Sequence, residues 1–134
     1  MREILFRGKR VDNGEWVYGV PTKDEQGELS FLPCQFYAIR DAICLYVDEN
    51  TVGQYTGLTD KNGKKIFEGD ILLKGFEKVL VKWNSNQCRW GIYSNNYEIC
   101  GFNESTQGYF EVIGNIYDNS ELLEVGKWKL NKNK

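Results

Sequence analysis

The chain contains no histidine among its 134 residues, and this absence narrows the chemistry that it offers. Histidine is the most frequent general base at neutral pH and a common ligand of metals. A Ser-His-Asp triad is therefore excluded, and a cysteine nucleophile would lack an imidazole base. We expect a protein that is not an enzyme and that carries no cofactor.

The chain also contains few prolines, no long apolar run and little net charge. Two prolines against 14 glycines favour ordered β-structure with tight turns over a disordered chain. No apolar stretch approaches the roughly 20 residues that cross a bilayer, and the first residues lack the apolar region of a signal peptide. We therefore expect a cytoplasmic location and no membrane partner. A formal net charge of −2 disfavours obligate non-specific binding to nucleic acid.

The four cysteines are isolated from one another in the sequence. They lie at Cys34, Cys44, Cys88 and Cys100, and no C-x-x-C pair occurs. Structural zinc sites normally use closely spaced pairs of cysteines. We expect free thiols that pack as small apolar side chains, and no metal site.

The chain does contain many aromatic residues, 14% of the total, in stretches that alternate with a period of two. This pattern, with turn signals about every ten residues, is typical of a small β-barrel or sandwich. No long amphipathic helix is visible, so the predicted fold is all-β with at most one or two short helical turns. One turn is expected at 121–123, capped by 118–120. Strands are expected at 4–11, 16–20, 29–32, 52–56, 64–67, 71–74, 78–83, 89–94, 97–102 and 109–117.

The succession of strands also predicts how the chain is organised. Residues 64–117 resemble an SH3-type small barrel, and the residues before them form an N-terminal β elaboration. No linker separates the two parts, so we expect one compact domain over residues 1–126. Residues 127–134 form a basic tail with four lysines. Residues 36–40 and 42–47 fit either a helical turn followed by a strand or two extended segments.

Two turn-rich regions are candidate binding surfaces, the loop 55–63 and the turn 68–70. An aspartate followed by a glycine recurs at 12–15, 24–28 and 60–64, which indicates repeated hairpin turns. The loop after Asp60 is too short and too rich in lysine for a calcium loop. The candidate binding residues are Tyr55, Thr56, Asp60, Lys61, Asn62, Glu68 and Asp70.

Two other functions stay open at this stage. Lys74, Lys82 and Trp90 interleave charge and aromatic surface, as in small barrels that bind single-stranded nucleic acid. Strand alternation alone would turn Val79, Val81 and Trp83 inward and Lys78 and Lys82 outward. Separately, the carboxylates of Glu68 and Asp70 would suit an enzyme that uses carboxylates alone, if one pKa were strongly raised.

Several blocks of sequence resemble the YopX family of phage and prophage proteins. The central blocks are 54–63 (QYTGLTDKNG) and 66–71 (IFEGDI), and the supporting blocks are 2–7, 111–119 and 121–123. Ser120 stands where the family pattern has proline. The resemblance implies an SH3-type barrel, a phage or prophage origin and a function that is uncharacterised.

The leading hypothesis is a non-enzymatic module that binds a phage or host protein in the bacterial cytoplasm. It is motivated by the barrel pattern, the abundant aromatics and the absence of a catalytic group of residues. The alternatives are a weak binder of single-stranded nucleic acid and a carboxylate-only enzyme. Unpaired strand edges also allow a homo-oligomer.

Overall fold

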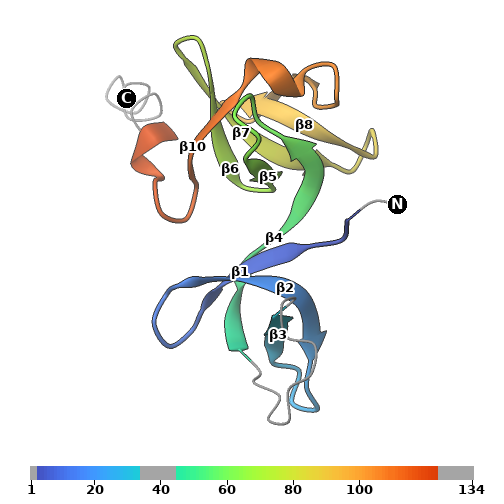
Figure 1. Cartoon of the computed structure of the whole chain (residues 1–134), viewed down its shortest axis with the longest axis vertical. Helices are drawn as coiled ribbons and strands as arrows, with labels where there is room; N and C mark the ends of the chain where they lie inside the picture. Colours follow the sequence, from blue (N-terminus) through green and yellow to red (C-terminus); the bar gives the residue numbers. More distant parts are fainter. Residues whose placement is uncertain (1–2, 34–44, 124–134) are drawn as a thin grey trace. The chain divides into compact units, whose positions relative to one another are not determined.

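The computed structural model describes residues 3–33 and 45–123. Its regular secondary structure is almost entirely β-strand (Figure 1). The chain forms two compact units, residues 1–55 and 56–134, and each is described by itself. The strands are β1 (Phe6–Arg10), β2 (Trp16–Lys23), β3 (Leu29–Pro33), β4 (Leu45–Thr59), β5 (Lys65–Phe67), β6 (Asp70–Lys74), β7 (Glu77–Asn84), β8 (Arg89–Ser94), β9 (Tyr97–Gly101) and β10 (Glu111–Asn115). A 3-10 turn, η1 (Gln107–Tyr109), lies between β9 and β10.

The first unit is a small ring of four antiparallel strands. β1 pairs with both β2 and β4, while β3 joins β2 to β4, so the hydrogen-bonded ladder closes on itself. Phe31 is completely buried in this unit, and Val47 and Leu5 are also buried. Gly8 lets β1 pack closely against Val47 of β4, because a β-carbon at position 8 would lie 3.2 Å from the Cβ of Val47.

The long strand β4 differs from the prediction. A separate strand at 52–56 and a loop at 55–63 were expected, but β4 runs without interruption from Leu45 to Thr59. Gly57 lies within this strand at a φ of +87°, a conformation that glycine adopts without strain. The glycine therefore marks an irregularity inside a strand and does not end it. The pairing of β1 with β4 also shifts register between Arg7 and Lys9.

The second unit contains a five-stranded antiparallel sheet in the order β10-β6-β7-β8-β9. This order, with a 3-10 turn before the last strand, is that of an SH3-type barrel, so the predicted fold class is confirmed. In its core, the rings of Phe102 and Phe110 meet edge to face, with their centres 5.6 Å apart. The other buried members of this core cluster are Leu58, Ile66, Leu72, Val79, Val81 and Ile92.

The final strand differs in part from the prediction, whereas the helical turn agrees with it. The strand expected at 109–117 is shorter, because residues 107–109 form η1 and β10 ends at Asn115. The pairing of β10 with β6 shifts register between Val112 and Gly114, which is a bulge at a glycine inside the strand. Residues 121–123 are helical, as predicted.

Some expectations lie outside the described residues. These are the alternatives for 36–40 and 42–44, the environment of Cys34 and Cys44, and the basic tail 127–134. The single domain expected over residues 1–126 stays a prediction. In the ranges 3–33 and 45–123, no helix is long and apolar enough to cross a membrane.

Candidate functional site

Asp60 organises the loop that was expected to bind a partner. Its Oδ1 accepts hydrogen bonds from the backbone N–H groups of Asn62 at 2.8 Å and Lys64 at 2.9 Å. Its Oδ2 accepts from the N–H of Val112 at 3.0 Å, which ties the loop to β10. Burial by itself raises the pKa of Asp60, but the three N–H donors stabilise its charged form, so the pKa lies below the ordinary 3.8.

The same turn occurs at Asp24 in the first unit. There Oδ1 accepts from the N–H groups of Gln26 and Glu28, at 3.0 and 2.8 Å. In both turns the glycine three residues after the aspartate donates its N–H to the aspartate carbonyl. The repeated sequence pattern at 24–28 and 60–64 is therefore repeated turn chemistry, as predicted.

Two further candidate residues are buried and hold the backbone. The Thr56 hydroxyl donates to the carbonyl of Ile66 at 2.8 Å and accepts from the N–H of Leu58 at 3.1 Å. Asp70 is only 1% exposed, and its Oδ2 accepts from the N–H of Phe67 at 2.8 Å. These contacts fix the strands β4, β5 and β6 relative to one another within the second unit.

The remaining candidates differ in exposure. Lys61 and Asn62 are exposed at the loop tip, and the Lys61 Nζ lies 3.8 Å from Oε1 of Glu111. Glu68 is half-buried, and Tyr55 is buried in the first unit. Of the seven predicted binding residues, Lys61 and Asn62 are thus the two that are exposed.

The three residues of the nucleic-acid alternative do not share one face. The Lys74 ammonium lies 5.6 Å from the centre of the Tyr109 ring, near the end of β6. Trp90 packs against the core and meets Trp83 edge to face at 5.1 Å. Because Lys82 neighbours Trp83 along β7, and Trp83 is paired with Trp90, Lys82 lies on the opposite face of the sheet from Trp90.

The face that carries Lys82 contains a groove of about 260 Å³, which we call the lysine groove. Its lining includes Lys78, Leu80 and Lys82 of β7, Tyr93 of β8, and Leu122 and Leu123. Phe76 at the β6–β7 turn and residues 94–96 also line it, and none of the lining residues in the described part of the chain is acidic. The outward direction of Lys78 and Lys82 was predicted from strand alternation, whereas the contribution of Leu122 and Leu123 was not.

Tyr93 fixes the position of one groove lysine. The Lys82 ammonium lies 4.8 Å from the centre of the Tyr93 ring, which is within the range of a cation–π interaction. Phe76 is fully exposed at the rim. Trp83, which was expected to point into the core, is 45% exposed because it lies near the end of β7.

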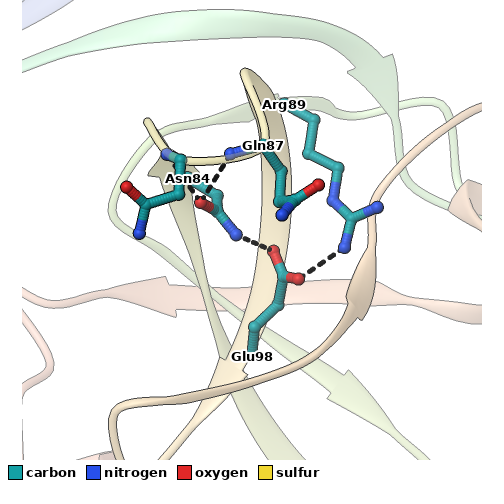
Figure 2. A network of polar contacts seen from close by, with 5 residues as sticks. Asn84, Gln87, Arg89 and Glu98 are labelled. Carbon is teal, nitrogen blue, oxygen red and sulfur yellow. Dashed lines mark hydrogen bonds and ion pairs between the residues drawn. The ribbon is translucent and has the colours of Figure 1, made fainter.

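A polar network lies beyond the Lys82 end of the groove (Figure 2). Glu98 accepts hydrogen bonds from Arg89 Nη2 at 2.5 Å and from Asn84 Nδ2 at 2.8 Å. The Arg89 hydrogen bond, and then that of Asn84, lower the pKa of Glu98 below its usual value, and Glu98 raises the pKa of Arg89. The charge of the Glu98 carboxylate is therefore already balanced by Arg89.

The described cysteines are free thiols, with Cys88 exposed and Cys100 half-buried. In residues 3–33 and 45–123, no three side chains of Cys, Asp or Glu gather where they would hold a metal ion. The prediction that the protein uses no metal or cofactor is not tested by this arrangement.

Comparison with known proteins identifies relatives in sequence and in fold. The family model for YopX protein matches residues 5–124. A crystal structure of protein EF1440 from Enterococcus faecalis is similar in fold, with a TM-score of 0.61 and 23% sequence identity. The similarity covers 92% of this chain and 99% of that chain. No curated protein matched the chain.

Proposed function

The chain belongs to the YopX family, and from this premise we propose that it is a non-enzymatic module of a phage or prophage that binds another protein in the bacterial cytoplasm. The binding surface in this proposal is the lysine groove of the second unit. The sequence resemblance to phage and prophage proteins supports the genomic context.

The observation that carries the proposal is the combination of charge and apolar surface in the lysine groove. Lys78 and Lys82 flank Leu80 on one strand, and among residues 3–33 and 45–123 no acidic side chain lines the groove. Interfaces between proteins use such mixtures of exposed apolar surface and charged groups, with the charge giving orientation and specificity.

The groove supports a protein partner better than the two alternatives. The carboxylate-only enzyme would need Asp70 to be accessible to a substrate. The Asp70 carboxylate is instead buried and accepts a hydrogen bond from a backbone N–H group, which suits a structural role. For nucleic acid, the aromatic Trp90 lies on the other face of the sheet from Lys82. Tyr93 does share the groove with Lys82, but the Lys82 ammonium lies over its ring, where a base would have to stack.

Photo-crosslinking from the groove rim tests the proposal in cells. A benzoyl-phenylalanine placed at Phe76, which is fully exposed, should crosslink to a protein when the chain is expressed in the bacterium that carries its gene. The same reagent at Tyr109, which is 65% exposed in the same unit but outside the groove lining, is the matched control. The crosslink should be specific to position 76 and should disappear when Lys78→Glu and Lys82→Glu are combined.

Three outcomes would contradict the proposal. One is equal crosslinking from both positions, and another is a crosslinked product that nuclease removes. The third is no crosslinked product from position 76 in cells in which the phage or prophage genes are expressed.

A further inference from the structure

The two lysines of the lysine groove are placed by strand geometry at a fixed spacing. Lys78, Leu80 and Lys82 follow one another at every second position of β7, so their side chains leave the sheet on the same face. A rise of about 3.3 Å per residue puts the Cα atoms of the two lysines about 13 Å apart. The groove thus presents a row of positive, apolar and positive side chains along one strand.

The positive charge of this row is not neutralised within the described parts of the chain. Ion pairs in those parts include Arg10 with Asp12, Lys61 with Glu111 and Arg89 with Glu98. In residues 3–33 and 45–123, neither Lys78 nor Lys82 takes part in an ion pair. The Glu98 carboxylate is bound by Arg89 and Asn84 instead of by a groove lysine. The groove is therefore complementary to a ligand that supplies the carboxylates.

The apolar part of the groove sets the second requirement on the ligand. Leu80 lies between the lysines, and Leu122 and Leu123 line the same space. The volume of about 260 Å³ is below the range of about 300–1,000 Å³ that is typical of small-molecule and cofactor pockets. One or two apolar side chains of an extended peptide are a better match for this size than an enclosed small molecule.

From this juxtaposition we propose that the lysine groove binds an extended segment of a partner protein in which two acidic residues, four positions apart, flank an apolar residue. β7 is paired on both sides, so the segment lies over the face of the sheet, where an extended chain has the same period of two. Its acidic side chains then reach Lys78 and Lys82 while the central apolar side chain meets Leu80. This inference rests on the proposed function and specifies the chemistry of the partner.

Fluorescence anisotropy with a synthetic peptide tests this assignment. The probe is a labelled peptide, Thr-Asp-Thr-Leu-Thr-Asp-Thr, added to the full chain. We expect saturable binding that weakens at least tenfold when both Asp residues of the peptide are replaced by Asn, and at least fivefold when its Leu is replaced by Ser. Binding should also weaken as salt is raised from 50 to 500 mM, because screening reduces the attraction of exposed charges.

Substitutions in the chain provide the matching controls. Lys78→Gln and Lys82→Gln should each weaken binding of the probe severalfold. Lys23→Gln in β2 and Lys64→Gln after Asp60, both at exposed lysines outside the groove lining, should leave it unchanged. Unaltered thermal unfolding would show that each variant is folded.

The following outcomes would contradict the proposal that the groove binds this acidic segment. It is wrong if the Asn peptide binds as tightly as the Asp peptide, if the four variants weaken binding equally, or if the probe does not bind. Tighter binding of a labelled oligothymidine than of the probe would assign the groove to single-stranded nucleic acid. If the probe fails while Phe76 still crosslinks to a protein, the proposed function stands and the ligand chemistry is different. If both fail, the proposed function fails as well.

Discussion

The Glu98 carboxylate lies directly over Gly91, in space that any other residue at position 91 would fill with its own side chain. A β-carbon at Gly91 would collide with the Glu98 Oε2 and would lie 2.9 Å from the Tyr93 ring. Gly101 is paired with Gly91 across the strands, and a β-carbon there would lie 3.1 Å from Nε of Arg89. Two facing glycines thus leave a shallow space on the sheet in which the Arg89–Glu98 pair lies.

Gly91→Ala should lower the free energy of unfolding by about 1–3 kcal/mol, the usual cost of inserting a methyl group where there is no space. Urea unfolding would measure it. Gly108→Ala is the control, because a β-carbon there meets nothing within 4 Å and should change stability by about 0.5 kcal/mol or less. In a Glu98→Ala background the cost of Gly91→Ala should shrink, and an unchanged cost would contradict this account of the space.

Asp60→Asn should destabilise the second unit more than Asp24→Asn destabilises the first. The Asn oxygen can still accept the two local N–H groups, but its NH₂ cannot accept from Val112 N–H, which is 52 residues away. We expect a loss of about 1.5–3 kcal/mol at Asp60, where a bond to a charged group is lost. At the half-buried Asp24, whose two N–H bonds are local, we expect about 0.5 kcal/mol or less. Amide hydrogen exchange would show whether Val112 loses its protection, and retention of that protection would contradict the assignment.

The Glu98 carboxyl should titrate below the ordinary glutamate value of 4.5 in an NMR experiment, because Arg89 and Asn84 both donate to its charged form. A pKa that is lower in the folded than in the unfolded chain gives stability that is present above about pH 4.5 and is lost as the pH falls through the folded value. Arg89→Gln should move the pKa of Glu98 back toward 4.5. If Arg89→Gln leaves the titration unchanged, the ion pair does not form in solution.

Thr56→Val should destabilise the protein by about 1–3 kcal/mol, although the two side chains have nearly the same shape. Valine leaves the N–H of Leu58 and the carbonyl of Ile66 without the hydroxyl that each bonds now, in a buried site. Thr59→Val, whose own hydroxyl makes none of these bonds, is the control. Equal effects of the two substitutions on chemical denaturation would show that the hydroxyl of Thr56 has no special role.

Local turn chemistry explains why so much of the strand order was predictable. An aspartate or asparagine beside a glycine specifies its turn through short-range hydrogen bonds, and Gly27 and Gly63 have the expected positive φ angles. Gly57 has the same conformation inside β4, where long-range strand pairing overrides the local signal. A glycine that breaks a strand and one that bends it look the same in a sequence.

The candidate site was less predictable, because its members meet only through tertiary structure. The alternation of β7 predicted the outward lysines, but nothing in the sequence indicated that Leu122 and Leu123 would line the same groove. Likewise, an aspartate in an exposed-looking loop gave no sign of a hydrogen bond to Val112. Both relationships join segments that are about 40 or more residues apart in the chain.

The continuity of β4 has a consequence for how such a protein can change in evolution. One strand supplies a ladder partner for β1 and β3 through its first part and for β5 through its last part. Recombination that exchanged one unit for that of a relative would have to join the two sequences within β4 and preserve the register on both sides. Such a junction falls among strand residues, where an inserted or lost residue shifts the register, so the two units are expected to be inherited together, as a single genetic module.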